Sequence, residues 1–283
     1  MDLVELQIFK TVAEQGGVTK AAAALHRVQS NVTTRVKQLE ERLGTKLFHR
    51  QGRRLVLSSE GKVLLDYADR MLRLSNEAQA ALKGHAPHGL FKLGTLESTA
   101  ATRLPPLLAR YHRRFPVVRL ELSTGTSGAL VDRVLRGEIE AAFVAEPFNA
   151  KGLQTAHAFT EELVLITPKS HAPVSSPADI EQRVILAFTT GCSYRRRLES
   201  WLGRSSIVAE RIMEYGSYHA IAACVAAGSG IAVVPKSVLR TTGVEGQVAL
   251  HPLPAKVANA RTMLAWRRGH TSAPLAALRE ELR

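Results

Sequence analysis

The sequence predicts an α/β protein with a small helical N-terminal module, a connecting helix, and a larger module of alternating strands and helices. Length is the first observation, because 283 residues are more than a single hydrophobic core usually holds. Pattern is the second: helix periodicity and one hairpin pattern precede residue 60, whereas strand-like and helix-like stretches alternate after residue 89. We therefore place domains at residues 1–58, 59–88 and 89–283.

Charge is the third observation, and it narrows the class of partner. The net charge of +13 and the pI near 10.2 favour a polyanion. Residues 20–62 concentrate this charge, with ten basic and three acidic side chains. The first 15 residues are acidic and amphipathic, unlike a secretory signal, and the apolar run at 220–235 is short and contains two glycines. We expect a cytoplasmic protein that does not enter the membrane.

Three helices are predicted before residue 45. The first covers residues 2–15, the second 20–25, and the third follows a turn at 26–28 and ends at Gly44. A helical wheel of the third helix has an apolar face, which we expect to be buried, made of Val32, Val36, Leu39 and Leu43.

The opposite face of the third helix carries short amides and hydroxyls. These residues are Gln29, Ser30, Thr33 and Thr34, followed by Lys37. Two helices joined by a short turn, with slim polar groups on the second, are typical of a helix-turn-helix that reads base edges in the major groove. The alternative is a capped surface helix with no role in DNA binding.

The segment LFHRQGRRLVLS, residues 47–58, predicts a β-hairpin with a basic tip. Arg50, Arg53 and Arg54 surround its turn, and a basic hairpin after a helix-turn-helix is a wing suited to phosphate or minor-groove contact.

Residues 1–62 resemble the DNA-binding domain of LysR-type transcriptional regulators. The resemblance is carried by LQIFKTVAEQGGVTKAAAALHRVQSNVTTRVKQLEERLGTKLFHR and LSSEG, and QLEERLGTKLFHR with the wing and the chain length makes it specific. It implies a regulator that binds a double-stranded DNA operator as a homodimer or homotetramer, responds to a small-molecule effector and contacts RNA polymerase.

The connecting segment predicts one long helix. Apolar and small residues recur at alternating spacings of four and three, as in a heptad pattern, at Leu64, Ala68, Met71, Ser75, Ala78 and Leu82. Such a pattern pairs two chains or packs on its own domain, and the resemblance favours pairing because this segment is the dimerising linker helix in LysR-type regulators. GHAPHG, residues 84–89, is the predicted hinge.

The C-terminal module predicts a ligand cleft where strands end and helices begin. Its elements include a helix near residues 99–115 and a strand at 141–145. The candidate effector-binding residues at these junctions are Glu97, Ser98, Thr99, Thr126, Ser127, Glu146, Cys192, Glu214, Ser217 and His219. The resemblance implies two α/β lobes like those of periplasmic solute-binding proteins, with lobe I at about 89–160 and 245–283 and lobe II at about 161–244.

Within the family, LFKLGTLESTAATRLP, LSTGTSG, CSYRRRLESW and SYHAIAACVAAGSGIAVVPKS resemble the regulators of putrescine utilisation. This implies a diamine effector whose ammonium groups pair with Glu97, Glu146 and Glu214. Helix N-termini and hydroxyls suit carboxylates instead, which are the commoner effectors in the family. The sequence leaves both open.

Two rival functions depend on Cys192. As a nucleophile with His219 as base it would indicate an enzyme, but the chain lacks HExxH, a phosphate-binding loop and a Gly-rich dinucleotide turn, so we expect no enzyme, no cofactor and no metal. As a thiolate near Arg195, Arg196 and Arg197 it would indicate a redox-sensing regulator. Cys224 lies on an apolar helix and is predicted to be a core residue.

Overall fold

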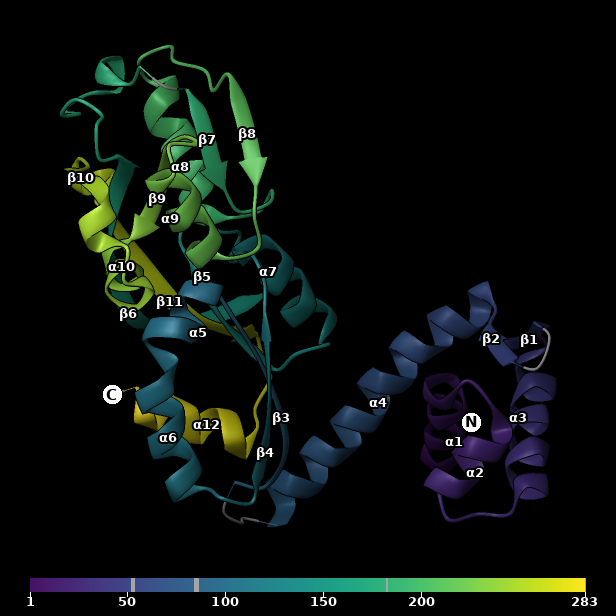
Figure 1. Ribbon diagram of the computed structural model, residues 1–283. Coiled ribbons are helices and arrows are strands. Elements are labelled where there is room, and N and C mark those ends of the chain that lie inside the picture. The colour runs from purple at the N-terminus through teal and green to yellow at the C-terminus, as the bar shows by residue number, and fades with distance from the viewer. Residues whose placement is uncertain (52–53, 84–86, 182, 283) are drawn as a thin grey trace. The chain divides into compact units, whose positions relative to one another are not determined.

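The computed structural model describes residues 1–51, 54–83, 87–181 and 183–282, which form two compact units, Met1–Gly84 and His85–Arg283 (Figure 1). The predicted fold class is confirmed, because a helix-turn-helix with a hairpin and a long helix is followed by a mixed α/β unit built on a curled sheet.

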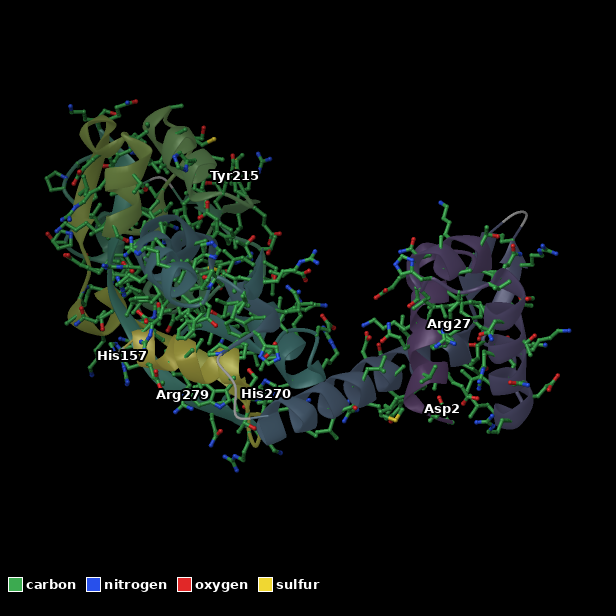
Figure 2. All side chains as sticks on the ribbon, turned by 90° about the horizontal axis from the view of Figure 1, so that it is seen from below. Asp2, Arg27, His157, Tyr215, His270 and Arg279 are labelled. Carbon is green, nitrogen blue, oxygen red and sulfur yellow. The ribbon has the colours of Figure 1, made fainter. Side chains whose placement is uncertain are left out.

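The first unit contains the three predicted helices, the hairpin and the connecting helix. Their bounds are α1 Leu3–Gln15, α2 Val18–Ala24, α3 Gln29–Leu43, β1 Phe48–Gln51, β2 Arg54–Leu57 and α4 Ser59–Lys83. The strands of the hairpin are antiparallel. Arg27 lies in the turn between α2 and α3, and its side chain is exposed (Figure 2).

The buried face of α3 differs from the prediction at its C-terminal end. Val32, Val36 and Leu39 are buried, whereas Leu43 is 39% exposed, so its predicted burial is wrong. The reason is that Glu40 is buried in the last turns instead. Its Oε1 accepts the backbone N–H groups of Leu47 at 2.9 Å and Phe48 at 3.3 Å, which ties the hairpin to α3.

A second buried carboxylate joins α1 to α3. Glu5 is 2% exposed and accepts two hydrogen bonds from the Arg42 guanidinium, at 2.8 and 2.9 Å. It also forms a reciprocal capping box with Asp2 at the start of α1 (Figure 2). The hydrogen bonds from Arg42 lower the pKa of the Glu5 carboxyl, so this group stays ionised in the folded unit.

Helix α4 packs on its own unit through part of the predicted heptad pattern. Ala68 is fully buried, and Leu64 and Met71 pack on the same core, which α1 also builds. These three positions therefore contact their own domain. The exposed apolar residues of α4 are Val63, Tyr67 and Leu74, at 58%, 53% and 65%.

Two of the predictions for the connecting segment fall where the structure gives no description. The side chain of Leu82, the last position of the heptad pattern, lies outside the described residues, and so does part of the predicted hinge at 84–89.

The second unit is organised by one long strand. Strand β6 has 16 residues; its first half pairs with β11 and its second half with β9 and β10, all antiparallel. The strand order is β10-β6-β11-β5-β3-β4, and β3 is parallel to both β4 and β5. The bounds are β3 Gly89–Thr95, β4 Val118–Thr124, β5 Ala141–Ala145, β6 Leu153–Pro168, β9 Ala232–Pro235, β10 Val248–Pro252 and β11 Asn259–Arg267.

Helices cover both halves of this sheet (Figure 1). In the first half they are α5 Glu97–Thr102, α6 Leu104–Arg114, α7 Ser127–Arg136 and α12 Ala273–Glu281. In the second half they are α8 Ser193–Gly203, α9 Tyr218–Ala226, α10 Lys236–Thr242 and α11 Ala255–Ala258, beside the parallel pair β7 Val184–Ala187 and β8 Arg211–Glu214. Short 3-10 turns lie at Pro177–Asp179 and Glu245–Gln247.

The single helix predicted near residues 99–115 is two helices, α5 and α6. Prolines at 105 and 106 cannot continue a helix but fit the first turn of a new one, so α6 begins at Leu104. Among the described residues, no helix is long and apolar enough to span a membrane.

We expect Glu5→Gln to lower the free energy of unfolding of the first unit by about 1.5 kcal/mol, the usual value of a hydrogen bond to a charged group. Because the Glu5 pKa is lowered in the folded state, this contribution is present above the ordinary carboxyl pKa and disappears as the pH falls through the folded pKa. Urea unfolding followed by far-ultraviolet circular dichroism, at neutral and acidic pH, measures both effects. Glu41→Gln, at an exposed position on α3, is the control. An unchanged difference between the two variants at acidic pH contradicts the assignment.

Candidate functional site

The outward face of α3 presents the polar residues that the sequence singled out. Gln29, Ser30, Thr33, Thr34 and Lys37 are all exposed. The Thr33 hydroxyl donates to the Gln29 carbonyl at 3.0 Å, which orients it and leaves its oxygen as an acceptor. The structure thus leaves these five side chains of α3 exposed, and their polar groups are of the kinds that pair with the edges of bases.

The N-terminal end of α3 adds features that the sequence reasoning missed. Val28 occupies the N-cap position and is 72% exposed, and the first turn contains neither a capping side chain nor an acidic residue. The positive end of the helix dipole is therefore not neutralised and suits a phosphate group. An exposed apolar side chain at the same place suits the methyl group of thymine.

Of the predicted wing residues, the structure describes one side chain. Arg50 lies on β1 and is exposed. Arg53 lies outside the described residues, and Arg54 begins β2 but has a side chain that the structure does not describe.

Four helices of the second unit begin around one cleft. Their N-cap residues are Leu96 for α5, Thr126 for α7, Cys192 for α8 and Ser217 for α9. The cleft is small and partly open to solvent. It is lined by Leu96, Glu97, Gly125, Thr126, Ser127, Ala145, Phe188, Cys192, Ser193, Tyr194 and Tyr218.

The structure places the predicted effector-binding residues in three groups. Glu97, Thr126, Ser127 and Cys192 line the cleft. Ser98 and Thr99 follow Glu97 in α5 and are buried. The remaining four, which do not line this cleft, are Glu146, Glu214, Ser217 and His219.

Two of the predicted residues outside the cleft lie beside arginine side chains. The Glu214 carboxylate pairs with Arg195, which also binds Glu199 at 2.8 Å. The Glu146 carboxylate lies 3.9 Å from Arg261. Each of these acidic groups therefore has an arginine of the protein within ion-pair distance.

Aromatic lining residues were missed by the sequence reasoning. Phe188 and Tyr218 have ring centroids 4.5 Å apart, and the Tyr194 ring lies 6.3 Å from that of Tyr218. Phe188 directly follows a buried strand and Tyr194 lies in the first turn of a helix, so in the sequence both look like ordinary core residues.

Hydrogen bonds join the two halves of the unit at the edge of the cleft. The Gly128 N–H donates to the Gly191 carbonyl at 3.2 Å, and Ser193 Oγ lies 2.9 Å from Ser127 Oγ and 2.6 Å from the Ala145 carbonyl. Both serines are buried. We call this set, from Ser127 and Gly128 to Gly191 and Ser193, the seam.

Among the described residues, Glu97 is the only carboxylate that lines the cleft. The Tyr218 backbone N–H donates to it, but its Oε2 atom is buried and has no hydrogen-bond partner within the described part of the chain. Burial raises the pKa of this carboxyl, because an apolar environment disfavours the charged form.

An ion pair with a buried carboxylate holds the far end of α5. The Arg103 guanidinium donates to both oxygens of Glu161 on β6, at 2.6 and 3.2 Å, and Ser237 Oγ on α10 donates to the same carboxylate at 2.8 Å. Glu161 is 3% exposed. The helix that carries Glu97 is therefore connected to both halves of the sheet.

Cys192 is not arranged as a nucleophile or as a reactive thiol. Burial raises the pKa of its thiol, and its partner is the Tyr218 hydroxyl. His219 is exposed and faces Glu97 instead. Within the described part of the chain, no three His, Cys, Asp or Glu side chains are grouped as metal ligands.

Comparison with known proteins assigns both units. Residues 3–62 match the family described as bacterial regulatory helix-turn-helix protein, lysR family, and residues 84–283 match the LysR substrate binding domain. The chain is 42% identical to the uncharacterized HTH-type transcriptional regulator YusT of Bacillus subtilis, with 93% of this chain and 88% of that protein aligned. It is 38% identical to GltR of the same organism, over 93% and 89%.

Solved structures show the same fold. A full-length, cysteine-substituted OxyR from Pseudomonas aeruginosa superposes with a TM-score of 0.75 and 23% identity, over 100% of this chain and 95% of that one. Full-length CbnR in complex with its target DNA superposes with a TM-score of 0.69 and 23% identity, over 100% and 99%.

We expect Gly191→Ala to destabilise the second unit by about 1–3 kcal/mol, the usual cost of a strained backbone conformation. Gly191 has a φ of +95°, and a Cβ atom there would lie 2.8 Å from Thr126 Oγ1. Thermal unfolding followed by tryptophan fluorescence reports this unit, because both tryptophans, Trp201 and Trp266, belong to it. Gly203→Ala is the control, since a Cβ atom there meets nothing within 4 Å. Equal melting temperatures for the two variants contradict the prediction.

Proposed function

The chain belongs to the LysR family of bacterial DNA-binding transcriptional regulators, and we propose that it reads an operator through α3 and responds to a small molecule in the cleft of its second unit. The observation that carries the first part is the exposed polar face of α3, at the open N-terminus of that helix. The cleft, lined by residues from both halves of the second unit, supports the other part.

Base reading is assigned to Gln29, Ser30, Thr33 and Thr34, with Lys37 beside them. An amide pairs with adenine, hydroxyls pair with several base edges, and a lysine contacts guanine or phosphate. Arg50, Arg53 and Arg54 are assigned to the DNA backbone, where cationic groups position the protein without selecting sequence. Val28 joins the base-reading group because its apolar side chain is exposed at the same end of α3.

Pairing of two chains is assigned to the exposed stripe of α4, defined as Val63, Tyr67 and Leu74. These residues lie at spacings of four and seven, so they share one face of the helix. A homodimer formed through this stripe would present two α3 helices to an operator with two half-sites.

The effector is proposed to act through the seam. A ligand changes the arrangement of the two halves only if it binds one arrangement more tightly than another. Ser127 and Ser193 of the seam line the cleft. A ligand bound there would therefore contact the residues whose hydrogen bond joins the two halves.

The narrower effector hypotheses differ in their support. A diamine such as putrescine requires two anionic groups, and only Glu97 of the three predicted carboxylates lines the cleft. Thiol sensing requires a stabilised thiolate, whereas burial raises the pKa of Cys192 and the neighbouring Arg195 pairs with two glutamates. The proposal therefore includes neither a diamine nor a redox signal.

We expect Thr34→Ala to relax base preference at one operator position, with a change in discrimination of about 1–3 kcal/mol. Arg50→Ala is expected to weaken binding to all sequences alike and to reduce the slope of log K against log salt by about 1. Binding of the full chain to a randomised duplex library, repeated at several salt concentrations, separates the two effects. Gln15→Ala, at an exposed position on α1, is the control. Uniform weakening by both substitutions rules out Thr34 as a base-reading residue.

We expect Leu74→Glu to convert the proposed dimer to a monomer, because it places a charge in an apolar interface. Sedimentation velocity measures the change, and the far-ultraviolet circular dichroism of the variant should be unaltered because Leu74 is exposed. Lys62→Glu, also exposed on α4 but outside the stripe, should remain dimeric. A Leu74→Glu chain that sediments like the parent excludes the stripe as the interface.

A further inference from the structure

We propose that the cleft binds a small molecule with one protonated amino group and an apolar body, and that the ammonium pairs with Glu97. The inference rests on the proposed function, since it names the ligand class of the same cleft. Four observations support it: one incompletely bonded carboxylate, no second one among the described lining residues, helix N-termini that already have acceptors, and an aromatic lining.

The first observation is the state of the Glu97 carboxylate. It accepts one backbone N–H, from Tyr218, while its buried Oε2 atom has no partner among the described residues. A buried carboxylate oxygen without a hydrogen bond is destabilised. A ligand with a positively charged N–H donor supplies the missing hydrogen bond to this oxygen and also favours the ionised form of the carboxyl group.

The second observation limits the number of cationic groups to one. Glu146 and Glu214 do not line the cleft, and each faces an arginine of the protein. A second ammonium group in the cleft would therefore be desolvated without an anionic partner, which is costly. A monoamine fits this arrangement and a diamine does not.

The third observation disfavours an anion. The N-terminal turns of α7, α8 and α9 face the cleft, but acceptors of the protein already occupy donors of each. The Ala129 N–H donates to Thr126 Oγ1 at 3.4 Å and the Gly128 N–H to Gly191, the Cys192 sulfur accepts from the start of α8, and Glu97 accepts from the start of α9. Glu97 thus already supplies the negative charge that this group of helix ends favours.

The fourth observation concerns the body of the ligand. Phe188 and Tyr218 offer two adjacent rings, and Leu96 and Ala145 complete an apolar wall. The cleft is small and partly open to solvent, so a compact ligand is required. Aromatic faces beside a carboxylate also attract a cation.

An ammonium has three N–H donors, so it needs acceptors besides the Glu97 carboxylate. The Tyr194 side chain lines the cleft, and its buried hydroxyl interacts with the side chains of Ser98 and Thr262. A hydroxyl oxygen that donates one hydrogen bond can still accept another. One carboxylate beside one hydroxyl acceptor matches one ammonium.

The experiment is isothermal titration calorimetry of the full chain with benzylamine, benzyl alcohol, benzoate and putrescine. These probes share a size range but differ in charge. We expect benzylamine to bind at least about tenfold more tightly than each of the others, as loss of a charge-assisted hydrogen bond predicts. Benzoate or putrescine binding as tightly as benzylamine, or no binding by benzylamine, overturns the inference without any variant.

Two variants locate the site. Glu97→Gln is expected to weaken benzylamine binding at least about tenfold, because the amide keeps the shape and loses the charge. Glu214→Gln removes a carboxylate outside the cleft and should leave the affinity within about twofold. Equal affinity of the Glu97→Gln chain and the parent overturns the inference. Tryptophan fluorescence melts confirm that both variants are folded before they are titrated.

Selection from a random duplex library separates this inference from the proposed function. Selection of a sequence motif in the absence of benzylamine binding overturns the ligand class alone. Selection of no motif overturns the proposed function, and the inference falls with it.

Discussion

Strand β6 is the constraint on which the second unit depends. Its 16 residues pair with β11 in one half and with β9 and β10 in the other, so one uninterrupted backbone is common to both halves. The halves can change their relative tilt only by bending this strand and its neighbours. The seam and the ion pair of Arg103 with Glu161 on β6 both join elements of the two halves, as the strand itself does.

The electrostatics of the cleft follow from that geometry. Four helices begin at one place, which concentrates the positive ends of their dipoles. Acceptors at these helix ends are the Glu97 carboxylate, the Cys192 sulfur and the Thr126 hydroxyl. Arg195 and Arg197, in the first half of α8, are bound to a carboxylate and to carbonyl groups. The acceptor groups already bonded to the helix N-termini therefore determine which sign of charge on a ligand the cleft favours.

Sequence patterns predicted the elements better than they predicted the contacts. The polar face of α3 and the hairpin follow from local periodicity and turn residues, and the structure has both. Leu43 was assigned to the wrong surroundings, and the heptad pattern alone left two environments open for Leu64, Ala68 and Met71. The reason is that a helical wheel does not show whether a face meets its own domain, a partner or solvent. In the cleft, junction positions indicated Glu97, Thr126, Ser127 and Cys192. Phe188 and Tyr194 carried no signal, since a buried aromatic residue that lines a cleft has the same local pattern as one in the core.

Coupling through the seam also implies that DNA binding affects ligand binding. If an occupant of the cleft and an operator both favour one arrangement of the two halves, each must raise the affinity of the other by the same factor. The DNA would then act as an effector of the cleft, and the hydrogen bonds of Ser127 and Ser193 would enter the affinity for operator sequences that they never touch. Promoters with different half-sites would consequently tune the metabolite concentration at which the same protein responds.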